Sequence, residues 1–211
     1  LNLPLFKSLC YKKIKKTKIV IYFHESQISY PRSIFDQDIK NKRDLHYTFI
    51  NYSSSLVSDY NLFNSQYHFN DYFLGISNYL KKMPDNKNFD SIEVIKKKSS
   101  ILHIGSNIKK FNNNKLKKNK FPVVLWNHRW EHDKNPELFF DVLYKIYNKK
   151  IKFNLIVLGE KFNFYPDCFN SAIKKLNDLI IHVGFCKSKK EYEYWLLKAD
   201  VLPVTSHQDF F

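Results

Sequence analysis

The stretch FPVVLWNHRWEHDKNPELFFDVLYKIYNKKIKFNLIVLGE, residues 121–160, decides the fold. Val123–Trp126 is a short continuous apolar run, which predicts a strand. Glu137–Tyr147 has helical periodicity, and its apolar residues fall on one broad face: Leu138, Phe139, Val142, Leu143, Ile146 and Tyr147. Phe153–Leu158 is a second apolar run. A strand, a helix and a strand in succession predict a parallel sheet.

The same alternation continues in both directions from this stretch. On the C-terminal side we expect helices at Asp167–Leu176 and Glu191–Lys198 and strands at Ile180–Val183 and Val201–Val204. On the N-terminal side we expect strands at Ile19–Phe23, Tyr60–Phe63 and Ser100–Ile104, and helices at Lys42–Ser58, Phe69–Leu80 and Asp90–Lys97. The continuous apolar run Ile19–Phe23 predicts a strand covered on both faces. In the first of these helices Leu45, Phe49, Tyr52 and Leu56 form the predicted buried stripe.

A segment rich in Asn and Lys, residues 109–120, interrupts the alternation and predicts a linker. It separates a first α/β domain, residues 1–108, from a second, residues 121–211. Both are predicted to be doubly wound parallel sheets. In such sheets ligands bind at the carboxyl ends of the strands, so we expect a ligand in the crevice between the two domains.

Composition restricts the class of protein. The 211 residues include 35 Lys and Arg against 20 Asp and Glu, a formal charge of +15. The longest apolar runs, such as Ile19–Phe23, are far shorter than the roughly 20 residues of a membrane span. Three cysteines without CxxC spacing favour a reducing, cytoplasmic environment. Apolar residues precede the lysines in Leu1–Lys18, the reverse of a secretory signal, so we interpret it as an internal segment, and both ends of the chain look interrupted.

Polar residues follow four of the predicted strands. His24 and Glu25 could act as acid and base, although Ile28 excludes a zinc HExxH motif. Residues 127–136 lie before a helix that Asn135 can cap and Pro136 can open, a place suited to a diphosphate. Within this stretch His128 and His132 have the i, i+4 spacing of a possible metal-binding pair. That spacing places them on one face only in a helix, and this stretch is predicted to be a loop. The other two polar segments are a Gly-Glu turn at residues 159–160, after the strand Phe153–Leu158, and a loop with an acidic residue at 205–211, after the strand Val201–Val204. Each of these is also compatible with an ordinary surface loop.

These stretches resemble one family when taken in order. The chain resembles the tRNA-queuosine alpha-mannosyltransferases, retaining glycosyltransferases of the GT-B fold. The matching segments are YFHESQISYP (22–31), WNHRWEHDKNPE (126–137), VLGE (157–160) and QDFF (208–211), with smaller matches at 51–52, 63–65 and 83–85. The P-loop pattern GxxxxGK[ST], the dinucleotide-binding pattern GxGxxG and the hydrolase pattern GxSxG are absent from the sequence. Family members also have segments before residue 1 and after residue 211, so the resemblance implies two truncated Rossmann-like domains.

The resemblance implies roles for individual residues. Arg129 and Lys134 would neutralise the donor diphosphate, and with His24, which faces the reacting sugar carbon, they form the catalytic set. The donor-binding set would be Asn127, His128, Arg129, Lys134, Gly159, Glu160 and Asp209. The acceptor side would be Glu25, Gln27, Tyr30, Asn51, Asn64 and Ser65. The family also implies GDP-mannose as donor, queuosine-containing tRNA as acceptor, and no metal ion or other cofactor.

Several alternatives remain open from the residues alone. The acceptor could be a glycan or a lipid, or the chain could be a non-catalytic binding module. A metal-dependent hydrolase using His128 and His132 is a further alternative. The lysines of the linker could contact RNA phosphates, but Lys is abundant throughout the chain and a lysine run is usually a solvated surface. The oligomeric state has no signature in the sequence.

Overall fold

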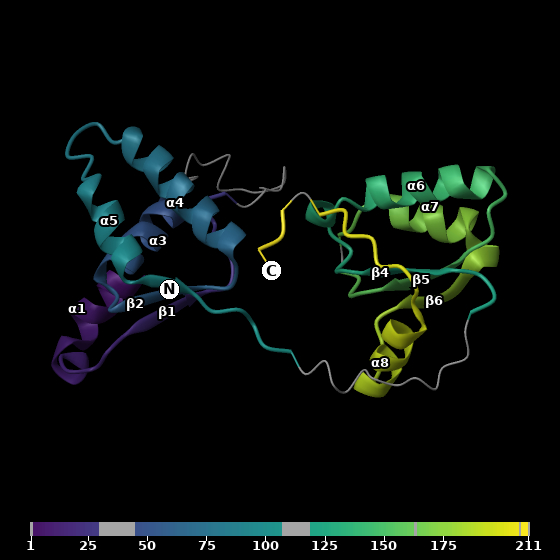
Figure 1. Cartoon of the computed structure of the whole chain (residues 1–211), viewed down its shortest axis with the longest axis horizontal. Coiled ribbons are helices and arrows are strands. Elements are labelled where there is room, and N and C mark those ends of the chain that lie inside the picture. The colour runs from purple at the N-terminus through teal and green to yellow at the C-terminus, as the bar shows by residue number, and fades with distance from the viewer. Residues whose placement is uncertain (1, 30–44, 107–118, 163, 207, 211) are drawn as a thin grey trace. The chain divides into compact units, whose positions relative to one another are not determined.

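The protein forms two compact units, each built around a three-stranded parallel sheet (Figure 1). The computed structural model describes residues 2–29, 45–106, 119–162, 164–206 and 208–210. Unit 1 comprises residues 1–105 together with 209–211, and unit 2 comprises residues 106–208. Residues 109–118 of the predicted linker lie outside the described residues, as do the first residues of the helix predicted from Lys42.

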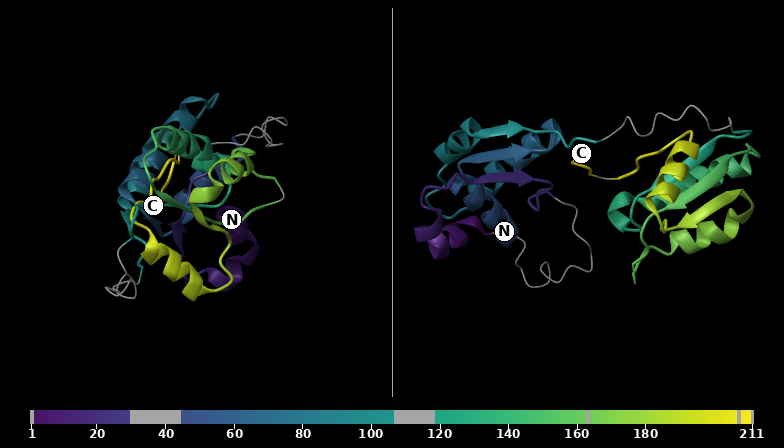
Figure 2. Two further views of the ribbon diagram at one scale, coloured as in Figure 1. Left: turned by 90° about the vertical axis from the view of Figure 1, so that its right-hand side faces the viewer. Right: turned by 90° about the horizontal axis from the view of Figure 1, so that it is seen from below.

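The sheet of unit 2 contains β4 (Val123–Asn127), β5 (Asn154–Leu158) and β6 (Ile180–Gly184), in that order. Figure 2 shows the strands of each sheet side by side. Alternate residues of β4 and β5 face opposite sides, and both sides are buried. One side carries Val124, Trp126, Leu155 and Val157, and the other carries Val123, Leu125, Ile156 and Leu158. Both strands are therefore covered on both faces, as their continuous apolar sequence requires.

Three helices cover this sheet. The helices α6 (Pro136–Asn148) and α7 (Cys168–Lys175) lie on one face, and α8 (Lys189–Lys198) lies on the other, as Figure 1 shows. Two short 3-10 turns, η2 (His132–Lys134) and η3 (Asn177–Leu179), connect these elements. The predicted last strand, Val201–Val204, is wrong in extent, because among the described residues only Val201 pairs with β4, through a single parallel bridge to Val124.

The buried face of α6 differs from the predicted one. Phe139, Phe140 and Leu143 are buried, whereas Leu138 and Val142 are 48% and 44% exposed. The helix is rotated toward α7, so Phe140 packs against both Trp126 and Phe169, with ring centroids 6.2 and 5.2 Å away. Periodicity alone gives the width of an apolar face but does not say which of its edges faces the sheet.

The sheet of unit 1 contains β1 (Val20–Phe23), β2 (Tyr60–Phe63) and β3 (Ser99–Ile101), also in that order. The core on one face joins Phe23 and Phe63 to residues of α3 (His46–Val57), α4 (Gln66–Lys81) and α5 (Asp90–Lys97). On the other face Val20 and Tyr60 are more than half exposed. Within the described part of the chain the helices therefore cover one face of this sheet, and the prediction that the strand at Ile19–Phe23 is covered on both faces is wrong.

Two helices of unit 1 depart from the expectations. Residues Leu3–Ile14 form α1, which the sequence pattern did not predict, and the Leu3 backbone N–H donates to Ser54 Oγ in α3 at 3.1 Å. The predicted stripe of α3 is wrong at two positions, since Leu45 and Phe49 are exposed. Small and polar residues, Thr48, Ser54 and Ser55, are buried there together with Tyr52. In the described residues no helix is long and apolar enough to cross a membrane.

Candidate functional site

A pocket of about 450 Å³ opens at the carboxyl ends of the unit 2 strands. The loops after all three strands line it: Asn127, His128 and Arg129 after β4, Leu158, Gly159 and Glu160 after β5, and Phe185, Cys186, Ser188, Lys189 and Tyr192 after β6. Five of the seven predicted donor-binding residues are therefore brought together, although they are separated by about 30 positions in the chain.

Gly159 sets the distance between the first two loops. Its φ is +116°, and a Cβ added to it would lie 1.9 Å from the His128 carbonyl oxygen. That carbonyl accepts a hydrogen bond from Trp126 Nε1 at 2.9 Å. The Trp130 backbone N–H donates to the Glu160 carbonyl at 3.1 Å, and Trp130 Nε1 donates to the Leu158 carbonyl at 3.2 Å. The two loops are thus joined by a close backbone approach that only glycine allows.

Arg129 is the predicted cation that lines the pocket. Its side chain is 53% exposed, and Nη2 lies 3.0 Å from Glu131 Oε2. A guanidinium has five N–H donors, so this ion pair leaves others able to bind an anionic ligand. The ion pair also orients the guanidinium before a ligand arrives. Beside it, Asn127 Nδ2 donates to the Tyr192 hydroxyl at 3.0 Å and connects the β4 loop to α8.

The helix N-terminus at this pocket belongs to α8. Ser188 caps it, since Ser188 Oγ accepts from the Glu191 backbone N–H at 3.2 Å, and the exposed Lys189 occupies the first helical position. The sequence predicts that the helix beginning at Pro136 supplies this terminus, but no residue of α6 lines the pocket. Positive charge from a helix N-terminus, Lys189 and Arg129 surrounds a space that could accept phosphate.

Lys134 has different surroundings from Arg129. Its ammonium lies 3.2 Å from a carboxylate oxygen of Asp133, and the two side chains are only 16% and 5% exposed. The Lys134 carbonyl accepts a hydrogen bond from Thr205 Oγ1 at 2.9 Å. Lys134 does not line the pocket. In this structure it neutralises a buried acid next to the start of α6.

The predicted acceptor-side residues lie in unit 1, where they have mixed surroundings. His24 and Glu25 are exposed after β1, and Gln27 Nε2 donates to Glu25 Oε1 at 3.2 Å. Asn51 is in α3, where its carbonyl accepts from the Tyr72 hydroxyl at 2.9 Å. Tyr30 lies outside the described residues.

Asn64 and Ser65 hold backbone in place. The buried Asn64 donates from Nδ2 to the His24 carbonyl at 2.6 Å, and its Oδ1 bonds His68 Nδ1 at 2.8 Å. Ser65 caps α4 and donates to the Phe210 carbonyl. Burial lowers the pKa of His68 to about 4, so its ring is neutral at pH 7. Asn64 therefore positions the loop that carries His24.

Asp209, the remaining predicted donor-binding residue, is exposed and belongs to unit 1. Its neighbour Phe210 is buried there, with its ring centroid 4.3 Å from that of His68.

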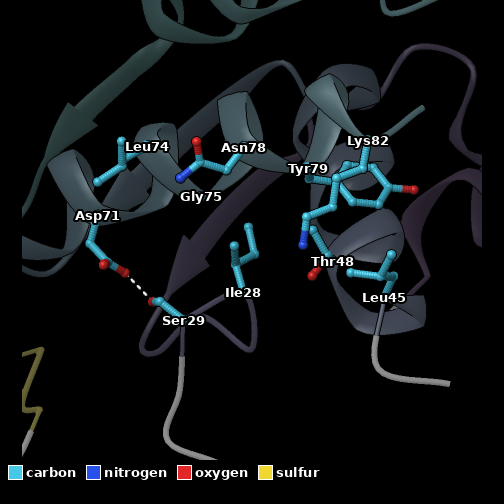
Figure 3. A pocket seen from close by; sticks show the side chains of 10 residues that line it. All are labelled: Ile28, Ser29, Leu45, Thr48, Asp71, Leu74, Gly75, Asn78, Tyr79 and Lys82. Carbon is cyan, nitrogen blue, oxygen red and sulfur yellow. Dashed lines mark hydrogen bonds between the residues drawn. The ribbon is translucent and has the colours of Figure 1, made fainter. Parts of the chain in front are cut away.

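A second, smaller pocket lies in unit 1 beside α4 (Figure 3). Asp71 and Asn78 of α4, and Lys82 directly after it, line the pocket together with Thr48 of α3 and the loop after β1. Ser29 donates a hydrogen bond to Asp71 across its edge (Figure 3). The pocket contains none of the predicted site residues.

The contribution of the segment after β6 to the unit 2 pocket was not predicted from the sequence. The pocket residues of this segment are Phe185, Cys186, Ser188, Lys189 and Tyr192. The signal was available, because this loop follows the strand predicted at Ile180–Val183, as the other loops follow theirs. Burial and the neighbouring Glu191 raise the pKa of the Cys186 thiol, so this pocket residue is protonated at neutral pH.

Comparisons with known proteins show the family of the chain. Residues 1–106 match a family model described as tRNA-queuosine alpha-mannosyltransferase N-terminal. The chain is 32% identical over 204 residues to the tRNA-queuosine alpha-mannosyltransferase of Drosophila melanogaster, covering 91% of this chain and 52% of that protein. The chain thus spans about half the length of this curated relative.

Two glycosyltransferase-like folds are similar in structure. An Anabaena protein, HepE, crystallised with UDP and glucose, superimposes with a TM-score of 0.58 at 12% identity over 99% of this chain and 51% of that one. The lipopolysaccharide outer core galactosyltransferase WaaB in its apo form gives 0.52 at 14% identity, over 100% of this chain and 55% of that one. These likenesses confirm the predicted GT-B fold.

Proposed function

The chain belongs to the tRNA-queuosine alpha-mannosyltransferase family, and on that basis we propose that the protein transfers mannose from GDP-mannose to the queuosine nucleoside of tRNA. The observation that carries this proposal is the unit 2 pocket, which joins Asn127, Arg129 and Gly159 to the N-terminus of α8. Because the chain spans about half the length of the Drosophila relative, the activity is proposed for the whole protein.

Transfer from a nucleoside diphosphate sugar develops negative charge on the departing diphosphate. Fixed positive charge at that place lowers the barrier, because the interaction is stronger in the transition state than in the ground state. Arg129, Lys189 and the α8 N-terminus are placed to supply it. We propose that they replace a metal ion in the transfer step, so added Mg²⁺ or Mn²⁺ is expected to leave the rate unchanged.

We propose that unit 1 provides the acceptor side, with His24, Glu25 and Gln27 on the exposed loop after β1. No enzyme nucleophile is assigned. In the proposed retaining reaction the departing phosphate takes the proton of the queuosine hydroxyl as that oxygen bonds to the anomeric carbon on the same face. Lys134, Glu160 and Asp209 keep their proposed donor-side roles on the strength of the family resemblance.

The test of donor binding is an Arg129→Ala variant titrated with GDP-mannose in a calorimeter. Loss of one charge-assisted contact to phosphate is expected to weaken binding by about 10- to 100-fold. Lys161→Ala is the matched control, because it removes one positive charge near the pocket without removing a lining residue. Equal affinity in the Arg129→Ala variant and the wild type would contradict the proposed role.

The test of the acceptor is transfer of labelled mannose to tRNA with and without queuosine. The proposal predicts label only on the modified tRNA. Equal labelling of both tRNAs would show that the enzyme recognises another acceptor group.

A further inference from the structure

Three side chains of types that bind metal ions lie close together beside the unit 2 pocket, and one of them, Cys186, also lines it. His182 is on β6, Cys186 follows the end of that strand, and Glu191 lies in the first turn of α8. One ligand atom from each lies within 4.8 Å of the others. Within the described residues no other such group of three occurs, and neither His128 nor His132 takes part in it.

We propose that His182, Cys186 and Glu191 bind a zinc ion that joins β6 to the start of α8. When zinc binds, the Cys186 thiol releases its proton to solvent. The resulting thiolate, imidazole and carboxylate form a donor set that Zn²⁺ accepts and that Mg²⁺ or Ca²⁺ does not prefer. Three protein ligands leave a fourth tetrahedral position, which water can fill.

The distances are close to what zinc needs. Around a tetrahedral zinc ion, with bonds of about 2.0–2.3 Å, the ligand atoms lie about 3.3–3.6 Å apart. Cys186 Sγ and His182 Nε2 are already 4.0 Å apart. Side-chain movements of less than about 1 Å therefore complete the geometry, without rearrangement of the backbone.

The neighbouring contacts hold two of the ligands in place. The His182 ring stacks on Trp195, with centroids 4.6 Å apart and planes 27° apart. Glu191 Oε2 accepts a hydrogen bond from the Lys187 backbone N–H at 2.9 Å, which leaves the other carboxylate oxygen for the metal. Such supporting contacts orient metal ligands and raise the affinity of a site.

Zinc at this site would also affect the pocket, because the site lies at both ends of a loop that lines it. The residues between Cys186 and Glu191 include Ser188 and Lys189, which line the pocket. A zinc ion bound at both ends of this loop would hold it fixed against β6. The site is distinct from the proposed transfer chemistry, so it is testable without any glycosyl donor.

The experiment is titration of the 211-residue chain with Zn²⁺, and with Co²⁺ as a spectroscopic probe. We expect one equivalent of Co²⁺ to give the intense near-ultraviolet absorption of a cobalt–thiolate bond, and Zn²⁺ to displace it. Cys186→Ser should abolish this absorption and weaken zinc binding by about 100-fold or more. Cys168→Ser and His132→Gln are the matched controls and should bind zinc as the wild type does.

A second measurement does not depend on the folding of a variant. Alkylation of the wild-type chain with iodoacetamide, followed by mass spectrometry, should show Cys186 protected by Zn²⁺ and Cys10 unaffected. Cobalt binding without a thiolate band, or equal alkylation of Cys186 with and without Zn²⁺, would overturn the proposal. Zinc binding that is lost in His132→Gln instead would place the metal at the other histidine pair and would equally overturn it.

Discussion

Replacement of Gly159 by Ala should destabilise unit 2 by more than the backbone strain of the substitution alone. The φ of +116° costs a non-glycine residue about 1–3 kcal/mol. The new Cβ would also lie 1.9 Å from the His128 carbonyl oxygen, a backbone atom that must move away. Its movement breaks the 2.9 Å hydrogen bond from Trp126 Nε1, and an unpaired indole N–H in the core costs about 1–3 kcal/mol.

Gly184 provides the matched control for this prediction. Its φ is +106°, but an added Cβ would have no atom within 4 Å. Gly184→Ala therefore carries the backbone strain without the collision. We expect Gly159→Ala to lower the free energy of unfolding by about 1–3 kcal/mol more than Gly184→Ala does.

Tryptophan fluorescence during urea unfolding measures this difference. All three tryptophans of the chain, Trp126, Trp130 and Trp195, lie in unit 2, so the signal reports on that unit alone. In a thermal melt followed by the same signal, the difference corresponds to a shift in Tm of about 4–8 °C per kcal/mol for a unit of about 100 residues. Equal stabilities of the two variants would show that the close approach of the loops contributes nothing.

Two further predictions concern stability. The pKa of His68 is about 4 in the folded state against 6.5 in the unfolded chain, so the unfolded state binds the additional proton between these values. The contribution of His68 to stability is therefore full above pH 6.5, and it falls by about 3 kcal/mol as the pH is lowered to 4. Urea unfolding of the wild type and of His68→Asn across this range measures it, and parallel pH profiles would contradict the assignment. Asn135 caps the start of α6 with a φ of +51°, and its Oδ1 accepts a hydrogen bond from the Leu138 backbone N–H. Asn135→Ala should cost about 2 kcal/mol and Asn135→Gly less than about 1 kcal/mol, measured by thermal unfolding; the reverse order would refute the capping role.

The strands of unit 2 were predictable because β4 and β5 are buried on both faces. Such strands consist of continuous apolar residues, and the run from Val123 to Trp126 has that character. The cover of unit 1 was not predictable in the same way. Ile21 and Phe23 pack into a core while Val20 is exposed, and a run of five apolar residues does not show that one face lacks a layer.

The helix faces were only partly predictable. In α3 the buried residues include Thr48, Ser54 and Ser55. Ser54 Oγ accepts a hydrogen bond from the Leu3 backbone N–H of α1, and Ser55 Oγ donates to the Tyr52 carbonyl. A search for apolar stripes finds Leu45 and Phe49 instead, and both are exposed. In α6 the contact between Phe140 and Trp126 decided the orientation.

The sequence by itself determined the strand–helix alternation and the residues that follow each strand. These are local properties, since periodicity and turn-forming residues act within a few positions of one another. Only the tertiary structure decided which of those residues share a pocket. Arg129 lines it while Lys134, five positions further on, pairs with Asp133, and Cys186 joins from a loop that is nearly 60 positions away. Parallel strand pairing brings such distant loops to one edge of a sheet, and the direction of each side chain there depends on packing between elements.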